Sequence, residues 1–503
     1  MSTRSANPLA MAGLLVPALL AGAACTLSLA PFGWWWAQAA TLTLLFLLWF
    51  GRSARVRAAL GFAFGLGWFG TAVSWVYVSM HEYGALPMPL AAAATLLFAA
   101  YLALWPALAG WLSARLAAGV PDWIIVPAAW CVAEWLRGWV FTGFPWATLG
   151  YAHTDGPLAG FAPLVGVHGI NLVAALIAVL LARALSAQQA AAGRIRAFLA
   201  AAMICAAGHA LQPSEWTQPA GAPLKVALLQ GNIAQQLKFE DGRFENTLET
   251  YRLLVEANPA PLVVLPETAL PRMLLAIPQG YLAQLSELMR RRGADLIVGV
   301  PRAETRSRYF NSAISMGASE PQRYDKVHLV PFGEFIPTGF RWFVDLMRIP
   351  LGDFTAGDQD AQPLAVAGQR VAINICYEDL FGEEIIRQVP KATILANLSN
   401  IAWFGDSLAP HQHLQISRMR SLETGRPMLR ATNTGYTAVV DHRGRVTHQL
   451  PLFMPGALVA DVQPTRGTTP YVRHGNWPVV SLAALALLAG AVRAFSLRAR
   501  SPA

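Results

Sequence analysis

Long apolar runs constrain this chain more than any other feature of its sequence. Such runs repeat before residue 212 and after residue 476, each about as long as the roughly 20 residues that a helix needs to cross a bilayer. Because the hydrocarbon interior offers the backbone no hydrogen-bond partner, each run is expected to be helical. We predict eight spans, near residues 9–27, 33–50, 58–79, 88–113, 122–139, 164–182, 197–211 and 477–492.

The charge of the chain follows the same division. The net charge is +9, yet residues 212–476 carry 26 Lys and Arg against 25 Asp and Glu. The rest carries 12 against 4, so +8 of the charge lies in the loops between the predicted spans. A nucleic-acid-binding protein would instead gather Lys and Arg on one face of a folded domain. The distribution therefore argues against a nucleic-acid partner.

The basic residues of the apolar parts predict an orientation in the membrane. The gaps at 28–32, 80–87 and 140–163 contain no Lys or Arg. Only Arg137 lies near them, and Glu134, three residues earlier on the same helical face, can pair with it. Cytoplasmic loops are enriched in Lys and Arg, so both termini are predicted in the cytoplasm and the polar block on the opposite side of the membrane. The other gaps and the termini hold Arg4, Arg52, Arg55, Arg57, Arg115, Arg183, Arg194, Arg196, Arg493, Arg498 and Arg500.

These patterns predict three segments. A transmembrane domain of seven helices covers residues 1–212, a water-soluble domain covers 223–463, and a C-terminal transmembrane helix covers 477–496. The first span has an alternative interpretation as a cleaved signal peptide, since Arg4 precedes an apolar run that contains Ala23-Ala24-Cys25. Its small-residue cleavage pattern is poor and another span follows at once, which favours a retained helix.

The polar block alternates short apolar segments with helical stretches, which is typical of an α/β domain. In such domains, functional residues gather where strands end and loops begin. Glu267 and Cys376 each follow a segment rich in Val, Leu and Ile. The predicted strands are 225–229, 262–265, 295–300, 371–375, 393–397 and 437–440, and the predicted helices are 245–256, 281–291 and 411–424.

Cys376 is the only cysteine of the polar block. The other three lie within predicted spans, at Cys25, Cys131 and Cys205. One interpretation is burial, since a free cysteine without a disulfide partner often acts as a small core hydrophobe. The other is catalysis, because a thiol attacks carbonyl groups when a base takes its proton and a cation stabilises the oxyanion. Glu267 as base and Lys326 as cation fit that chemistry, although spacing alone does not bring the three together.

Three motifs favour catalysis over simple burial of Cys376, because they resemble those of a known superfamily. They lie in the order Glu, Lys, Cys that is typical of the nitrilase superfamily, at Leu265-Pro-Glu-Thr-Ala269, Asp325-Lys-Val-His-Leu-Val-Pro-Phe-Gly-Glu334 and Ile375-Cys-Tyr-Glu-Asp379. Within that superfamily the chain resembles the apolipoprotein N-acyltransferases over essentially its whole length. That resemblance rests on the predicted spans and on Phe141-Thr-Gly-Phe-Pro-Trp146, Ala402-Trp-Phe-Gly405, Thr469-Pro-Tyr471 and Gly475-Asn-Trp477.

The resemblance implies a fold and a set of roles. The fold would be a nitrilase-like αββα sandwich attached to eight transmembrane helices in the bacterial inner membrane, with the sandwich on the periplasmic face. The catalytic residues would be Glu267, Lys326 and Cys376. A second carboxylate, that of Glu334, would orient the lysine or the base, and Tyr377 and Glu378 would act beside the nucleophile.

The implied reaction has two substrates. A phospholipid, phosphatidylethanolamine by resemblance, would leave its acyl group on Cys376 as a thioester. The N-terminal amine of a diacylglyceryl-cysteine apolipoprotein would then accept it. This chemistry requires no cofactor and no metal. His328, His411 and His413 suggest a metal site, but no third ligand at usable spacing accompanies them, so they are interpreted as structural.

Two residues differ from the family pattern, and two alternative functions compete with acyl transfer. Phe239 replaces a tryptophan, and Ile401 an aspartate, that the family pattern leads us to expect. Neither touches the three catalytic residues. The first alternative is a membrane-tethered amidase that hydrolyses small amides, although a tether needs one span rather than eight. The second is a transporter or binding protein whose polar domain has lost catalysis, which the intact Glu, Lys and Cys disfavour.

Overall fold

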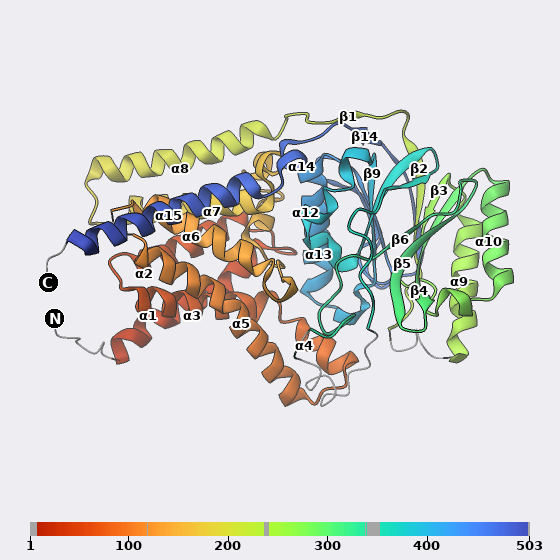
Figure 1. Ribbon diagram of the computed structural model, residues 1–503, viewed down its shortest axis with the longest axis horizontal. Coiled ribbons are helices and arrows are strands. Elements are labelled where there is room, and N and C mark those ends of the chain that lie inside the picture. Colours follow the sequence, from red (N-terminus) through yellow and green to blue (C-terminus); the bar gives the residue numbers. More distant parts are fainter. Residues whose placement is uncertain (1–7, 118, 236–240, 338, 340–352, 501–503) are drawn as a thin grey trace. The chain divides into compact units, whose positions relative to one another are not determined.

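The computed structural model describes residues 8–117, 119–235, 241–337, 339 and 353–500, and the chain divides into two compact units (Figure 1). The first unit consists of Met1–Tyr77, Pro87–Ser214 and His474–Ala503. The second consists of Val78–Leu86 and Glu215–Arg473. Phe239 of the predicted departures lies outside the described residues.

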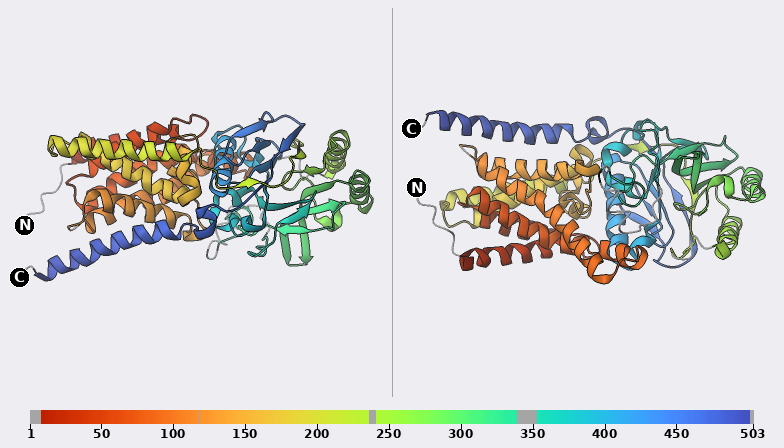
Figure 2. Two further views of the ribbon diagram at one scale, coloured as in Figure 1. Left: turned by 90° about the horizontal axis from the view of Figure 1, so that it is seen from above. Right: turned by 60° about the horizontal axis from the view of Figure 1, so that its bottom comes forward.

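Helices occupy all eight ranges that were predicted as spans (Figures 1 and 2). Five helices of the described chain are long and apolar enough to cross a membrane, and a bent pair makes a sixth. With 15 and 16 residues, α2 and α6 are shorter than a typical span. The chain is a membrane protein, while the count of eight spans stays a prediction. The helices are α1 (Pro8–Cys25), α2 (Trp35–Trp49), α3 (Ala54–Ala72), α5 (Met88–Arg115), α6 (Asp122–Arg137), α7 (Ala162–Leu185), α8 (Ala191–Leu211) and α15 (Trp477–Arg500).

The third predicted span, 58–79, is wrong at its C-terminal end. Helix α3 ends at Ala72, where Val73 leaves helical geometry with φ −116° and ψ 24°. A second helical segment, Val76–Tyr83, follows at an angle of 59° and contains α4 (Val76–Val78) and the π-turn Ser79–Tyr83. The apolar composition continues through the break, so hydropathy alone did not reveal it.

Small residues allow the helices of the first unit to pack closely. A Cβ atom on Gly61 of α3 would lie 2.3 Å from the carbonyl oxygen of Pro106 in α5, and one on Gly65 would lie 2.7 Å from the Cα of Ala103. Larger side chains at these positions would push the two backbones apart, as at other close helix crossings in membranes. The predicted pairing of Glu134 with Arg137 is confirmed at 2.7 Å.

Two six-stranded sheets form the second unit. One has the order β13-β2-β3-β4-β5-β6 and the other β12-β11-β10-β9-β8-β7, with parallel strands at the centre of each. The first contains β2 (Leu224–Gln230), β3 (Leu262–Val264), β4 (Asp295–Thr305), β5 (Arg308–Gly317), β6 (Arg323–Asp325) and β13 (Gly456–Val462). The second contains β7 (Leu364–Val366), β8 (Gln369–Ile375), β9 (Ile394–Ser399), β10 (Met428–Thr432), β11 (Ala438–Val440) and β12 (Val446–Gln449).

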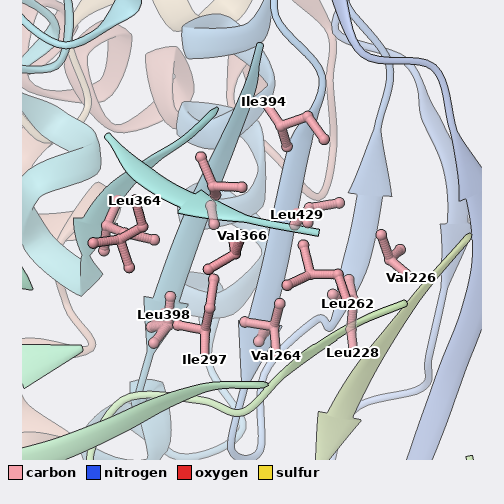
Figure 3. Close-up of a cluster of buried hydrophobic side chains, with 14 of the residues drawn as sticks. Val226, Leu228, Leu262, Val264, Ile297, Leu364, Val366, Ile394, Leu398 and Leu429 are labelled. Atoms are coloured by element: carbon pink, nitrogen blue, oxygen red, sulfur yellow. The ribbon is translucent and has the colours of Figure 1, made fainter. Parts of the chain in front are cut away.

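Alternation along the strands builds the layers of this unit. On β2, the side chains of Val226 and Leu228 join a core shared by both sheets (Figure 3). The alternate residues Ala227 and Leu229 point to the other face of the sheet and pack toward α9 (Phe244–Ala257) and α10 (Gln279–Arg291). The other sheet does the same, with α13 (Leu408–Thr424) and α12 (Gly382–Ile385) on its outer face. The αββα layering and the α/β class predicted from the sequence are therefore confirmed.

Candidate active site

Cys376 lies at the carboxyl end of β8, where the strand passes directly into the 3₁₀ turn Cys376–Leu380. Its φ is +53°, a left-handed conformation that costs a non-glycine residue roughly 1–2 kcal/mol. Burial, reinforced by the carboxylates of Glu267 and Glu334, raises the pKa of the Cys376 thiol to about 12, while Lys326 and the backbone N–H of Asn400 act in the opposite direction. The thiol is therefore protonated at neutral pH and needs a base at the moment of attack.

Glu267 follows β3 by three residues and is 7% exposed. Its Oε1 accepts a hydrogen bond from the side-chain amide of Asn311 at 2.7 Å, and its Oε2 accepts one from the backbone N–H of Asn400 at 2.7 Å. These two donors come from different sheets, β5 and the end of β9. The carboxylate is thereby fixed between the sheets at the edge where Cys376 lies.

Lys326 directly follows β6 and is 1% exposed. Its Nζ lies 2.9 Å from Glu334 and 3.6 Å from Glu267 Oε1. Burial by itself lowers the pKa of Lys326, but the negative charges of Glu334, Glu267 and the Cys376 thiolate form outweigh burial and raise it above its usual value. The side chain is a permanent cation and can stabilise negative charge that develops beside it.

Glu334 completes a group of two carboxylates around one ammonium. Its Oε2 accepts the backbone N–H of Val330 at 2.8 Å, and its Oε1 accepts both Lys326 Nζ and the Asn311 amide. With Lys326 charged, the ionised group carries one net negative charge next to a neutral thiol. Such an excess is suited to removing a proton from the thiol.

Asn311 is a residue of this site that the sequence did not reveal. Its side-chain Nδ2 donates to Glu267 at 2.7 Å and to Glu334 at 2.8 Å, and its backbone carbonyl accepts the N–H of Lys326 at 2.8 Å. Asn311 therefore contacts three site residues from the middle of β5, a strand that was not predicted. An asparagine within a buried strand is a usable signal once that strand is recognised.

Glu378 connects the segment after Lys326 to Ile375, the last residue of β8 before Cys376. Its Oε1 accepts hydrogen bonds from Tyr324 at 2.9 Å, from the Val327 N–H at 2.6 Å and from the His328 N–H at 3.1 Å. Its Oε2 accepts the Ile375 N–H at 2.6 Å. Burial raises the pKa of Glu378 to about 7, and Lys326 and the three backbone donors oppose that rise. Every contact to this carboxylate comes from a donor.

Tyr377, the residue after Cys376, forms an aromatic group with His328 and Phe381. The ring of Phe381 stacks on His328 at 3.4 Å between centroids, and Tyr377 meets Phe381 edge-on at 5.3 Å. His328 Nδ1 lies 2.9 Å from the carboxylate of Glu384. The side chain of Tyr377 thus packs in one aromatic group with Phe381 and His328.

The remaining residues singled out from the sequence lie in separate networks. His411 Nδ1 lies 3.2 Å from the Tyr436 hydroxyl, and His413 lies among buried polar groups below Cys376. Within the described residues, no three His, Cys, Asp or Glu side chains are placed to hold a metal ion. Ile401 is buried at the start of the 3₁₀ turn Ile401–Phe404, while Trp403 is exposed and meets Tyr83 edge-on at 5.9 Å.

Two family models match this chain, one in each of its two main parts. Residues 21–180 match the family model of the apolipoprotein N-acyltransferase N-terminal domain, and residues 225–471 match that of carbon-nitrogen hydrolases. Among solved structures, a carbon-nitrogen hydrolase from Helicobacter pylori is 19% identical, with a TM-score of 0.37, over 48% of this chain and 89% of its own.

Curated relatives match along nearly the whole chain. The apolipoprotein N-acyltransferase of Ralstonia nicotianae is 51% identical over 97% of this chain and 95% of its own length. That of Nitrosomonas europaea is 48% identical over 97% and 99%. Identity of this extent, across both the apolar and the polar parts, places the chain in the apolipoprotein N-acyltransferase family.

Proposed function

We propose that this chain transfers a fatty acyl group from a phospholipid, through a thioester on Cys376, to the N-terminal amine of a diacylglyceryl-cysteine apolipoprotein. The observation that carries the proposal is the buried group of Glu267, Lys326 and Glu334 beside Cys376, in a chain whose other unit consists of apolar helices. The group supplies acyl chemistry, and the helices supply access to lipid. The curated relatives carry the name of this activity.

The first half-reaction forms the thioester. Glu267 accepts the proton of the Cys376 thiol as sulfur attacks the ester carbonyl carbon of the phospholipid. Lys326, which is held beside Glu267 at 3.6 Å, stabilises the oxyanion of the tetrahedral intermediate. When the intermediate collapses, the carbon–oxygen ester bond breaks, and the glycerol oxygen leaves with the proton from Glu267. A lysophospholipid departs, and phosphatidylethanolamine is the proposed donor.

The second half-reaction moves the acyl group to nitrogen. The α-amine of the apolipoprotein attacks the thioester carbonyl, Glu267 accepts a proton from that nitrogen, and the carbon–sulfur bond breaks. The thiol then recovers its proton from Glu267, and an amide remains on the apolipoprotein. Since the lysophospholipid leaves before the amine reacts, the kinetics are expected to be ping-pong.

The supporting residues have distinct proposed roles. Glu334 holds the Lys326 ammonium at 2.9 Å, so that the cation does not collapse fully onto Glu267. Asn311 spaces the two carboxylates by donating to both. Glu378 fixes the loop of Lys326 against the strand of Cys376, and Tyr377 packs beside the nucleophile.

The proposed setting is the bacterial inner membrane, crossed several times. Residues 1–212 and 477–496 would form the membrane domain, and 223–463 the catalytic domain. The absence of Lys and Arg from the gaps at 28–32, 80–87 and 140–163 supports cytoplasmic termini and a periplasmic catalytic domain. Cysteine accessibility labelling in intact cells, at positions in these gaps, would check the orientation.

Reconstitution with defined substrates tests the function. The purified full chain is incubated with phosphatidylethanolamine and a diacylated lipopeptide, and the products are separated by mass. Lysophospholipid together with a triacylated peptide is expected. Free fatty acid without acylated peptide would contradict the proposal and favour the amidase alternative. A lipopeptide whose N-terminus is acetylated serves as the control, since it offers no amine and is expected to remain unchanged.

A further inference from the structure

We propose that His413 and Asn397 are positioning residues that hold the backbone carbonyl of Cys376 and thereby keep the nucleophile in its left-handed conformation. His413 Nε2 lies 3.2 Å from this carbonyl oxygen, and Asn397 Nδ2 lies 3.3 Å from it. We call His413, Asn397 and Arg430 the carbonyl seat. The inference rests on the proposed function only in what Cys376 does, not in how it is held.

Arg430 selects the tautomer of His413. The guanidinium carries only donors, and its Nη2 lies 2.7 Å from His413 Nδ1. His413 Nδ1 must therefore accept, which places the ring hydrogen on Nε2, toward the Cys376 carbonyl. Burial and the charge of Arg430 lower the pKa of His413 well below its usual value. The ring is neutral, with one nitrogen accepting and the other donating.

Arg430 also selects the orientation of Asn397. Arg430 Nη1 donates to Asn397 Oδ1 at 3.0 Å, and the Ser399 hydroxyl donates to the same oxygen at 2.7 Å. Two donors on one side fix that atom as the amide oxygen, so the NH₂ group faces Cys376. The same NH₂ group donates to Asn374 Oδ1 at 2.6 Å, so Arg430, Ser399 and Asn374 together orient Asn397.

The helix that carries His413 makes the seat rigid. Helix α13 begins after the Ser407 cap and ends at Gly425, whose φ is +64°. His413 and Ser417 lie one turn apart on the same face, and Ser417 contacts both Arg430 and Asp379. Asp379 in turn lies 3.1 Å from Arg430 Nη1 and 3.5 Å from His413 Nε2. The carboxylate balances the charge of the guanidinium below the site.

The geometry at Cys376 explains why a seat is needed. A φ of +53° is sparsely populated for a residue with a side chain and persists where the surroundings enforce it. Because the peptide group is planar, two hydrogen bonds to the Cys376 carbonyl fix the whole plane between Cys376 and Tyr377. Loss of the seat would let this plane rotate and move the sulfur away from Glu267 and Lys326.

The test compares His413→Leu, which removes the donor, with His413→Gln, whose side-chain NH₂ can donate while its oxygen accepts from Arg430. Thr424→Val is the matched control, since Thr424 is equally buried on α13 and its hydroxyl donates to the Arg420 carbonyl of the same helix at 2.7 Å. Two readouts are used in the folded full chain: kcat and KM for acyl transfer, and the rate of Cys376 alkylation by iodoacetamide, located by peptide mass.

For His413→Leu, kcat and the alkylation rate are expected to fall about 10- to 100-fold, the effect of a misplacement on the order of 1 Å, with KM changed less than about threefold. His413→Gln is expected to recover most of both rates, and Thr424→Val to keep them. Unchanged rates in His413→Leu would overturn the seat. Equal loss in the Leu and Gln variants would also overturn it, since the ring rather than its donor would then matter.

Two further comparisons apply when His413→Leu does not fold or when the wild-type chain shows no acyl transfer. If His413→Leu does not fold, His413→Gln is compared with His413→Glu, which has the same length but no donor for the carbonyl. The seat predicts faster alkylation in the Gln variant, and equal rates would contradict it. Iodoacetamide needs no lipid, so failure of wild-type acyl transfer would refute the proposed function while the alkylation rates still judge the seat.

Discussion

Two buried ion-pair groups, one in each unit, show that burial of charge does not by itself mark an active site. In the first unit, Glu134 and Arg137 are 1% and 0% exposed and meet through two hydrogen bonds, at 2.7 and 3.0 Å. The spare donors of Arg137 bind the carbonyls of Phe144 and Trp146 and the hydroxyl of Thr148. One charge balances the other, and the surplus donors organise the segment that follows α6.

The group in the second unit is equally buried but unbalanced. Lys326 faces both Glu267 and Glu334, and a neutral thiol lies next to them. Removing a proton from Cys376 and placing it on a carboxylate conserves the total charge, so the reaction needs no external counter-ion. We therefore interpret an excess of one charge beside a thiol, rather than burial of charge alone, as the more useful indicator of catalysis.

Removal of the thiol is expected to have the largest effect on acyl transfer. Cys376→Ala should lower acyl transfer by at least about 10⁴-fold, because no thioester can form. Thermal unfolding should change little. Cys131→Ala in α6 provides the control: that cysteine is fully buried in the first unit, and Glu134, three residues later, is ion-paired with Arg137, so this variant should keep its transfer rate. Equal loss in the two variants would remove the distinction between the units.

Replacement of the cation in each group should separate catalysis from stability. Lys326→Met removes the cation from Glu267 and Glu334, and Arg137→Met removes it from Glu134. Loss of the cation from a buried ion pair costs about 3–5 kcal/mol of unfolding free energy. Only Lys326→Met should also lower kcat in the folded fraction, by about 10²- to 10³-fold, since oxyanion stabilisation is lost. Circular dichroism against temperature and transfer assays on folded protein measure the two effects. An equal loss of kcat in Arg137→Met would contradict the distinction between the two ion-pair groups.

Removal of the carboxylate spacer should have a smaller effect. Asn311→Leu deprives Glu267 and Glu334 of one donor each, and a lost buried hydrogen bond of this kind costs roughly 1–3 kcal/mol. If that cost falls on the transition state, kcat drops about 10- to 100-fold. The variant Asn311→Asp adds a third carboxylate to the group and is expected to be worse than Leu. A more active Asp variant would contradict the spacing role.

The pH dependence of thiol reactivity tests the same site without any substitution. Burial and the carboxylates raise the pKa of Cys376 to about 12, so the thiolate fraction increases about tenfold per pH unit across the neutral range. Iodoacetamide alkylation of Cys376 is expected to keep rising from pH 7 to 9.5, beyond the point where a free thiol levels off near its pKa of about 8.5. A plateau near pH 7 would mean that a lowered pKa, not a base, activates the thiol.

The sequence predicts those parts of the fold and site that depend on strong local patterns. Helical ranges follow from apolar runs, and central strands such as β2, β4 and β8 follow from Val, Leu and Ile between turns. Glu267 follows β3 and Cys376 follows β8, so both candidates could be predicted. The break after Ala72 could not be predicted, because the composition stays apolar through it.

The residues that escaped prediction act through the fold rather than through a motif. Asn311 lies on β5, whose Asn, Ser and Ala residues weaken the strand pattern, and it reaches Glu267 only because β5 pairs with β4. Asn400 contributes a backbone N–H, which no residue type encodes. His413 was interpreted as structural from its spacing, whereas its position below Cys376 depends on how α13 packs on its sheet.

Intact-protein mass spectrometry tests the thioester on Cys376 most directly. The purified full chain is mixed with phosphatidylethanolamine of one defined acyl composition, without an acceptor peptide. One added acyl mass is expected on the wild-type protein, located on the Cys376 peptide, released by hydroxylamine at neutral pH and absent from Cys376→Ala. A wild-type chain that produces lysophospholipid without this adduct, or an adduct that persists in Cys376→Ala, would contradict it.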